Sequence, residues 1–407
     1  MRTVAEHRST ILGHIAPLAP RPLPIGDCLG LVTCADVVAQ VDLPGFDNSA
    51  MDGYAVRGAD TAAATADRPV TLAVIGEVAA GDDASGLAVT AGQAVRIMTG
   101  AMMPAGADAV VMVERTDGGL DAVAVSAPVT AGTSLRRFGE DVRRGTVVIP
   151  AGTRVNPRTI ALAASTGNAL LSVRPRPRVA VVSTGAELIP PGTPLLPGQI
   201  HESNAPMLAA SVRQRGAEVV AQLCVDDDPD ALLATLNELA ASCDAIVTSG
   251  GVSMGAYDVV KAALAAYGVE FVQVAMQPGK PQGFGMLAGS GVPIFALPGN
   301  PVSSFVSFEM FVAPALDHMM GVVDERRIVP GVLGHALTSP PGRTQVARAV
   351  TDHVDGHWVV DPVIGQGSHF LHDLVRANSL VLVPADVTAL AAGDAVEVWL
   401  LEGTGRG

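Results

Sequence analysis

The chain has 407 residues, a length typical of about two to four domains rather than one ordinary core. Hydrophobic residues make up 49% of it, charged residues 16% and aromatic residues only 3%, which excludes long disorder and requires cores of small aliphatic side chains. The formal net charge of -14 disfavours binding to nucleic acid and to anionic membrane surfaces.

The sequence shows no signal-peptide pattern, no membrane-helix pattern and no paired-cysteine motif. Residues 1–15 carry charges through their first turns, unlike a signal peptide, and no segment reaches the ~18 uninterrupted apolar residues of a membrane helix. Cys28, Cys34, Cys224 and Cys243 form no CxxC pair, so we expect buried thiols in a reducing compartment. These features predict a cytoplasmic protein.

The first part of the chain combines two helical segments with many short strands. Residues 3–17 have the spacing of a short amphipathic helix, and residues 40–145 contain Val-rich runs broken by Gly, Asp and Pro, typical of a β-rich domain. Residues 157–172 predict a second helix, which we expect beside the N-terminal one. The β-rich domain would then be an insertion.

Residues 178–320 alternate strand and helix patterns in strict succession. This order predicts right-handed crossovers and a parallel sheet covered by helices on both faces. Asp228 before Pro229 predicts the start of a helix, and Asn300 before Pro301 repeats the signal.

Beyond about residue 325 the chain returns to Val-rich strands, preceded by the linker-like residues 324–327. The predicted fold class is therefore multidomain α/β plus β, with a central parallel-sheet α/β domain, a β-rich inserted domain and a C-terminal β-barrel-like domain. The predicted boundaries are 1–25 with 146–175 for a discontinuous helical domain, 26–145 for the insertion, 176–324 for the α/β domain and 325–407 for the last.

Ligands of an open parallel sheet bind beyond the carboxyl ends of its strands. Four loops are expected at that edge, at residues 183–188, 225–229, 249–255 and 297–303. The third offers unhindered backbone amides and hydroxyls, and the fourth a helix N-terminus that favours an anion. Together they predict a phosphate or oxyanion site, although either loop alone could be an ordinary turn.

Two lysines, Lys261 and Lys280, are the only ones in the chain, and no arginine occurs between residues 216 and 320. A lysine retained in such a composition suggests a need for a compact point charge, and Lys280 lies in a glycine-rich stretch. The alternative is two ordinary surface lysines.

The same loops carry the carboxylates Glu187, Asp227 and Asp258. A carboxylate beside a phosphate is repelled unless a divalent cation such as Mg²⁺ lies between them. The combination predicts metal-assisted chemistry on a phosphoanhydride or phosphoester. Simple helix capping is the other reading of Asp227, because Asp226 and Asp228 flank it.

Polar loops also occur in the β-rich region, at residues 46–57, 96–101 and 139–145. On their own they are compatible with hairpin turns.

Seven motifs in this order carry a resemblance: FDNSAMDGYAVR, RIMTGA, GEDVRRG, STGAEL, SGGVSMG, PGKPQGFG and LPGNPVSS. Together they resemble the molybdopterin molybdenumtransferases, the molybdenum-insertion enzymes that include the E domain of gephyrin. The resemblance covers nearly the whole chain. It implies insertion of molybdate into adenylylated molybdopterin with release of AMP, in a step that depends on Mg²⁺.

The resemblance also implies a homodimer whose site lies between two subunits, with transient contact to the adenylyltransferase. Asp52, Thr99 and Asp141 would face the site from the partner subunit, together with Glu187, Asp258 and Lys280 as catalytic residues. Glu187, Asp227 and Asp258 would hold the metal. The substrate-binding residues it implies are Ser249, Gly250, Gly251, Ser253, Gly255, Pro298, Gly299, Asn300, Pro301 and Ser303.

Two positions depart from the pattern of the family. Gln277 stands where many relatives have lysine, and the aspartate doublet around Asp227 is a triplet here. The alternatives are a metal-dependent nucleotide pyrophosphate hydrolase and a non-catalytic scaffold of the same fold. The choice between molybdate and tungstate stays open.

Overall fold

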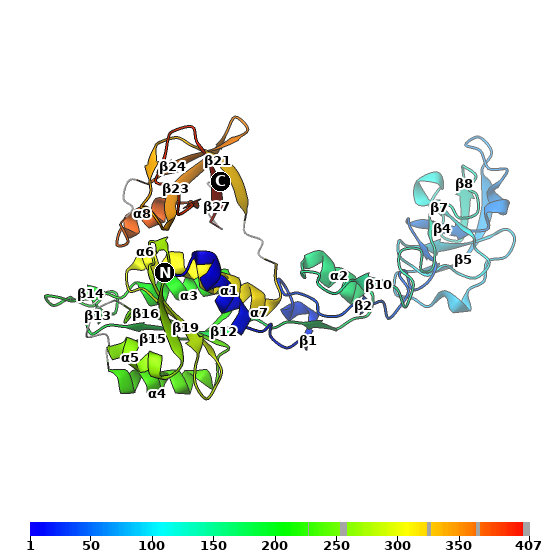
Figure 1. Cartoon of the computed structure of the whole chain (residues 1–407). Helices are drawn as coiled ribbons and strands as arrows, with labels where there is room; N and C mark the ends of the chain where they lie inside the picture. The colour runs from blue at the N-terminus through cyan, green and yellow to red at the C-terminus, as the bar shows by residue number, and fades with distance from the viewer. Residues whose placement is uncertain (227, 253–258, 324–326, 364–366, 402–407) are drawn as a thin grey trace. The chain divides into compact units, whose positions relative to one another are not determined.

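A computed structural model describes residues 1–226, 228–252, 259–323, 327–363 and 367–401. The chain divides into two compact units (Figure 1). Unit 1 contains Met1–Arg21, Gly30–Val32 and Arg174–Gly407, and unit 2 contains Pro22–Leu29 and Thr33–Val173. The finer division into four domains stays a prediction.

Unit 2 is built on a five-stranded sheet in the order β7-β4-β6-β5-β8. Valine and alanine of these strands fill buried clusters with Tyr54 and Leu72, as the low aromatic content predicts. The strands are β4 (Gly53–Val56), β5 (Val70–Val78), β6 (Gln93–Ile97), β7 (Ala109–Met112) and β8 (Ala122–Val125).

Short two-stranded pairs complete unit 2. They join β1 (Arg21–Pro24) to β11 (Leu170–Val173), β2 (Val37–Val38) to β10 (Val147–Ile149), and β3 (Asn48–Ser49) to β9 (Leu135–Arg136). Helix α2 (Pro157–Ser165) starts at a capping box formed by Asn156 and Thr159. The predicted helix over 157–172 is therefore too long, because its last residues form β11.

The N-terminal helix α1 (Val4–His14) does not share the unit of α2. It packs against the helical segment Phe308–Met320 of unit 1, and Ile11 and Ile15 are buried in the core there. The expected pairing of the two helices stays a prediction. The apolar face of α1 is covered by a partner about three hundred residues away in sequence, which periodicity cannot reveal.

The α/β part of unit 1 contains a six-stranded sheet in the order β15-β12-β16-β20-β19-β17. The first four strands are parallel, but β19 runs antiparallel to both of its neighbours. The sheet is thus mixed, and the expectation of a wholly parallel sheet is corrected. The strands are β12 (Arg178–Thr184), β15 (Glu218–Val225), β16 (Ala245–Ser249), β17 (Val269–Gln273), β19 (Pro281–Met286) and β20 (Pro293–Leu297).

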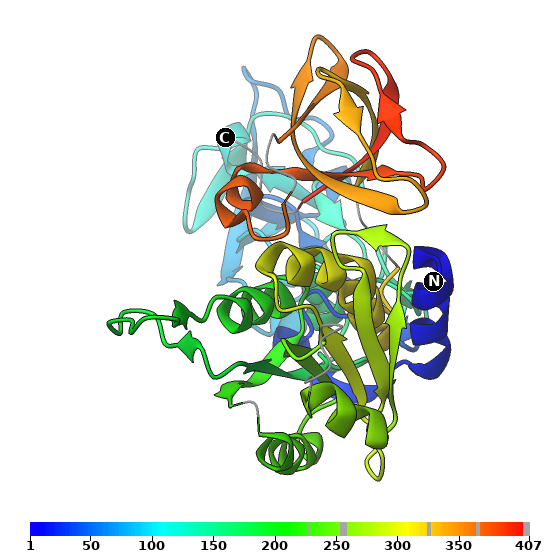
Figure 2. The ribbon, with the colours of Figure 1, turned by 60° about the vertical axis from the view of Figure 1, so that its left-hand side comes forward.

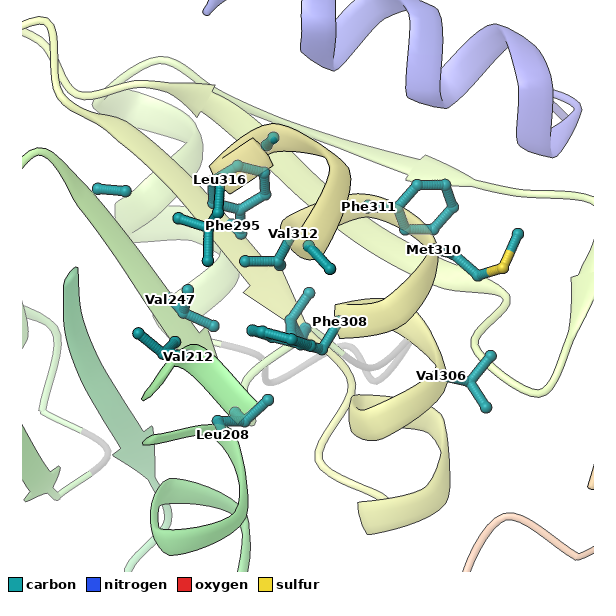
Figure 3. Close-up of a cluster of buried hydrophobic side chains, with 14 of the residues drawn as sticks. Leu208, Val212, Val247, Phe295, Val306, Phe308, Met310, Phe311, Val312 and Leu316 are labelled. Carbon is teal, nitrogen blue, oxygen red and sulfur yellow. The ribbon is translucent and has the colours of Figure 1, made fainter. Parts of the chain in front are cut away.

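Helices cover both faces of this sheet. One face packs on α3 (Asn204–Gln214) and on a continuous helical segment made of α6 (Pro301–Ser307), the π-helix η5 (Phe308–Val312) and α7 (Ala313–Met320). Figure 3 shows this core, with Leu208 and Val212 of α3 facing Phe308 and Leu316. The other face packs on α4 (Pro229–Ala240) and α5 (Val259–Ala266). Asp228 caps α4 through the backbone N–H groups of Asp230 and Ala231, as predicted.

The C-terminal strands close into a barrel, because β23, β24, β21, β27 and β25 pair in a ring that returns to β23 (Figure 2). The predicted barrel-like fold is confirmed. Its strands are β21 (Ile328–Leu333), β23 (Thr344–Val354), β24 (His357–Pro362), β25 (Ser379–Val383) and β27 (Ala395–Leu400), with β18 (Met276–Gln277) added beside β23.

Smaller elements complete unit 1. They are β13 (Leu188–Ile189) with β14 (Ile200–His201), β22 (Leu337–Thr338) with β26 (Ala389–Leu390), and α8 (Leu371–Arg376). No helix among the described residues is long and apolar enough to cross a membrane. Cys28 and Cys243 are buried and burial raises the pKa of the Cys243 thiol to about 11, whereas Cys224 is exposed, contrary to expectation.

Candidate active site

The four predicted loops leave the sheet at one edge. Strands β15, β12, β16 and β20 are neighbours and parallel, so residues 183–188, 225–229, 249–255 and 297–303 all begin at their carboxyl ends. Strand β19 is antiparallel to β20 and therefore starts at the same edge, which brings Lys280 there. Topology thus gathers the described members of the predicted α/β site residues along one edge.

The turn after β16 requires glycine. Gly250 has φ +104° and donates its N–H to the carbonyl of Leu297 at 3.2 Å. A Cβ at Gly250 would lie 2.5 Å from the carbonyl oxygen of Thr184. Gly251 also has positive φ, at +65°. These two glycines let the backbone turn tightly between β12 and β20, as an amide cradle for an anion requires.

Asn204, the first residue of α3, holds two of the loops together. Its Nδ2 donates to Ser249 Oγ at 2.9 Å and to the Gly299 carbonyl at 2.6 Å. Ser249 in turn contacts the Pro298 carbonyl and Ser304 Oγ, each at 3.3 Å. The substrate-binding residues predicted after β16 and β20 are therefore cross-linked by a side chain that sequence reasoning missed.

A buried carboxylate, Glu202, supports this crosslink. It is 7% exposed and accepts hydrogen bonds from Ser183 Oγ at 2.9 Å and from the backbone N–H groups of Asn204 and Ala205 at 2.8 and 2.9 Å. Glu202 thus fixes the start of α3 against the end of β12, where the helix dipole favours a negative charge. The signal missed in the sequence is the Glu-Ser-Asn run immediately before an apolar helix.

Three buried polar atoms near this edge have no hydrogen-bond partner among the described residues: Thr184 Oγ1, Thr248 Oγ1 and Asn204 Oδ1. Thr184 and Thr248 are 5% and 0% exposed and share the face of the sheet that carries α4 and α5. Unsatisfied buried polar atoms are rare in native proteins and cluster where a ligand or water completes the structure. Their position supports a ligand site at this edge.

The start of α6 is not the free anion site that we expected. The Val302 N–H donates to the Ser368 carbonyl at 3.1 Å, and the Asn300 side chain donates to Ser368 Oγ at 3.0 Å instead of capping the helix. Ser368 precedes α8, so a segment of the C-terminal part covers this helix end. Pro298 and Ser303 are buried, Pro301 is half-buried, and Gly299 and Asn300 are exposed.

Lys280 lies in a tight turn between β18 and β19 and is half-buried. Its backbone carbonyl accepts the N–H of Val274 at 2.8 Å. Gln277 accepts a hydrogen bond from Arg343 Nη1 at 3.1 Å. An arginine of the C-terminal part therefore places a positive charge beside Gln277, where many relatives have lysine. Lys261 lies 5.7 Å from the centroid of the Phe271 ring, a cation–π contact.

The predicted carboxylates are only partly described. Glu187 is exposed and lies in the loop after β12, where a Cβ at Gly185 would come within 2.9 Å of Glu187 Oε2. Asp227, Ser253, Gly255 and Asp258 lie outside the described residues. Within the described part of the chain, no three His, Cys, Asp or Glu side chains converge on a metal position.

In unit 2 the structure joins two of the three predicted site residues. Thr99 donates to Asp52 Oδ1 through its backbone N–H at 2.6 Å and its hydroxyl at 2.8 Å. These two bonds lower the pKa of the Asp52 carboxyl, so the carboxylate stays ionised. Asp141 is exposed and its N–H donates to the Leu43 carbonyl. Among the described residues, no hydrogen bond joins Asp141 to the Asp52–Thr99 pair.

Models of known families match this chain in three consecutive parts. Residues 2–167 match the MoeA N-terminal region (domain I and II), residues 180–318 a probable molybdopterin binding domain, and residues 330–401 the MoeA C-terminal region (domain IV).

Whole-chain relatives give the same result. The chain is 50% identical to Molybdopterin molybdenumtransferase 2 of Mycobacterium tuberculosis, over 98% of this chain and 99% of the relative. It is 39% identical to Molybdopterin molybdenumtransferase of Synechococcus elongatus, over 95% and 96%. Among solved structures, the molybdopterin biosynthesis MoeA protein of Pyrococcus horikosii matches with a TM-score of 0.80 and 30% identity, over 98% of this chain and 99% of that one.

Proposed function

The chain belongs to the molybdopterin molybdenumtransferase family, and on this premise we propose that it inserts molybdate into adenylylated molybdopterin and releases AMP. One observation carries the proposal. The glycine turn after β16, the Asn204 crosslink and Lys280 lie at one edge of the sheet, in a chain that matches the family from end to end. The rival hydrolase and scaffold functions are not favoured.

The residues at this edge suit an anionic substrate. The backbone amide of Gly251 and the ammonium of Lys280 would stabilise negative charge on phosphate or molybdate oxygens. Tetrahedral molybdate resembles phosphate in charge and shape, so one cradle serves both anions. Asn204 Oδ1 and Thr184 Oγ1 are the buried polar atoms that a bound substrate would satisfy.

We propose Mg²⁺ as the activating cation, held by Glu187, Asp227 and Asp258. Carboxylate oxygens are the donors that Mg²⁺ prefers, and it commonly bridges one or two carboxylates to substrate phosphates. The exposed Glu187 and the Thr184 hydroxyl, which has no hydrogen-bond partner among the described residues, supply oxygen donors at the end of the same strand. Bound there, the cation would offset charge on the leaving phosphate.

We further propose a cytoplasmic homodimer in which Asp52, Thr99 and Asp141 of one subunit complete the site of the other. The Asp52–Thr99 hydrogen bonds support a functional role, because an exposed carboxylate held by two donors has a fixed direction. The adenylylated substrate itself implies transient contact with an adenylyltransferase.

The decisive experiment measures AMP release from adenylylated molybdopterin with Mg²⁺, with and without molybdate. Release that depends on molybdate and yields active cofactor supports the transferase. Equal release without molybdate would indicate a hydrolase, and binding without release would indicate a scaffold. Chelation by EDTA should abolish release, and added Mg²⁺ should restore it.

A further inference from the structure

We propose that Gln282 is a positioning residue that holds the turn of Lys280 in place, so that the Lys280 ammonium meets the molybdate oxygens. The inference rests on the function proposed above and deepens it. It concerns a buried amide in β19 that lies within the PGKPQGFG motif but is not among the predicted site residues.

Gln282 is an unusual side chain for its surroundings. It is 1% exposed, in a strand where glycine and apolar residues surround it. Its Nε2 donates to the Gly279 carbonyl at 2.6 Å and to Ser307 Oγ at 2.6 Å. The Gly279 carbonyl can only accept, which fixes the orientation of the amide. Both hydrogens of Nε2 are therefore used, one on each side.

The two bonds join the Lys280 turn to a helix of the site. Gly279 immediately precedes Lys280, and Ser307 is the last residue of α6, whose first residues include Pro301 and Ser303. Space around the turn is tight, because a Cβ at Gly279 would lie 3.0 Å from Ser307 Oγ and 3.3 Å from Gln282 Nε2. The turn is thus anchored to α6 through the Gln282 side chain.

Other contacts hold the turn at its two ends. The Lys280 carbonyl accepts the Val274 N–H at 2.8 Å, and Arg343 Nη1 donates to Gln277 Oε1 at 3.1 Å. Gln282 acts between these points, at Gly279. The backbone on which the Lys280 side chain stands is therefore fixed before a ligand binds.

Fixed backbone matters for a lysine. Its long side chain carries about 2 kcal/mol of rotamer entropy. If the turn were also mobile, ordering both the turn and the side chain would offset much of the free energy gained when the ammonium binds an anion. Charge stabilisation depends on groups that are already oriented, and a displacement of about 1 Å can cost about a hundredfold in rate. Loss of the Gln282 bond to Gly279 should therefore weaken the response of Lys280 to molybdate.

The lysine content of the chain permits a direct test. Lys261 and Lys280 are the only lysines, so Lys261→Arg leaves Lys280 as the sole lysine, with one NMR signal when lysine is ¹³C-labelled at Cε. Molybdate is titrated into this parent protein, into Gln282→Met, which keeps the volume but removes both donors, and into Ser307→Ala. Ser307→Ala is the matched control, because it removes one bond of Gln282 and leaves the bond to Gly279.

We expect molybdate to shift the Lys280 signal of the parent. For Gln282→Met the apparent Kd should rise at least about tenfold, while Ser307→Ala should stay within about twofold of the parent. In the AMP-release assay, Gln282→Met should raise the KM for molybdate more than it lowers kcat. Gln282→Asn, too short to span both acceptors, replaces Gln282→Met if that variant does not fold.

Equal molybdate titrations of the Gln282 variant and the parent would overturn the inference. Equal weakening by Ser307→Ala and Gln282→Met would also overturn it, because the effect would then arise from α6 and not from the turn. A parent whose Lys280 signal does not respond to molybdate would refute the role of Lys280 in the proposed function. That failure is distinguishable, since it occurs before any change at Gln282.

Discussion

The buried histidine of α1 predicts a specific loss of stability in acid. His7 is 2% exposed, its ring packs edge-on against Phe311 of η5 at 4.8 Å between centroids, and its Nδ1 has no hydrogen-bond partner within the described part of the chain. Burial, and secondarily the charge of Arg2, lower the pKa of His7 from 6.5 to about 4, while Glu270 opposes the shift. The imidazole is therefore neutral in the folded protein at pH 7.

Because this pKa is lower in the folded than in the unfolded protein, the unfolded state binds more protons between pH 6.5 and about 4. The stability that neutral His7 permits is fully present above pH 6.5 and is lost as the pH falls through this window. One pKa unit corresponds to about 1.4 kcal/mol, so the shift amounts to about 3 kcal/mol of unfolding free energy.

Tryptophan fluorescence provides the assay. Trp358 and Trp399 are the only tryptophans and both lie in unit 1, and Trp399 belongs to the same buried cluster as Ile11 of α1. Urea unfolding should be followed at several pH values for the wild type and for His7→Phe, which keeps an aromatic ring against Phe311. The difference in unfolding free energy between the two should change by about 3 kcal/mol from pH 7 to pH 4.

A difference that stays constant over this range would refute the reasoning, because carboxylates elsewhere affect both proteins equally. His14→Phe controls for the added ring, since His14 is exposed on the same helix. For His14→Phe, the difference in unfolding free energy from the wild type should therefore stay the same between pH 7 and pH 4.

Three further outcomes follow from particular contacts. Gly250→Ala should reduce AMP release at least about tenfold, because its Cβ would meet the Thr184 carbonyl at 2.5 Å, whereas Gly289→Ala, with φ +91° and no neighbour within 4 Å, should keep normal release. Asp317→Ala should lower the free energy of urea unfolding by about 3 kcal/mol, because it removes the buried carboxylate that pairs with Arg215, whose Nε lies 2.9 Å from Asp317 Oδ1. Asp52→Ala should suppress AMP release without moving the tryptophan-monitored urea midpoint, because both tryptophans lie in the other unit; normal release would remove Asp52 from the site.

Local patterns predicted most of the strands and helices. The Val-rich run 70–78 is β5 over its whole length, and the Asp-Pro signal at 228–229 marks the start of α4. Both succeed because alternation and capping are determined within a few residues. Strand β19 was missed because its PQGFGM sequence looks like a glycine-rich loop, and only its position between β20 and β17 makes it a strand.

The candidate site was predictable in its loops but not in its support. The Gly250–Gly251 turn and Glu187 are visible in sequence, and topology accounts for their lying at the carboxyl ends of neighbouring strands. Asn204, Glu202 and Gln282 were missed because each acts through partners distant in sequence, such as Ser249 for Asn204 and Ser307 for Gln282. The covering of the α6 start by Ser368 likewise depends on the C-terminal part, which local reasoning treated as separate.

The pairing of α1 with Phe308–Met320 has a consequence for biosynthesis. On the ribosome α1 emerges first, and its partner follows about 300 residues later, a wait of roughly 15 to 60 s at about 5 to 20 residues per second. Unit 2 is complete by Val173 and can fold in the meantime. Because β1 pairs with β11, the chain leaves unit 2 close to where it came in, and the Arg174 side chain bonds the Leu18 carbonyl at 2.6 Å. A folded unit 2 thus shortens the effective loop between α1 and the rest of unit 1. Synthesis from the N-terminus therefore lowers the entropic cost of bringing α1 to its partner helix.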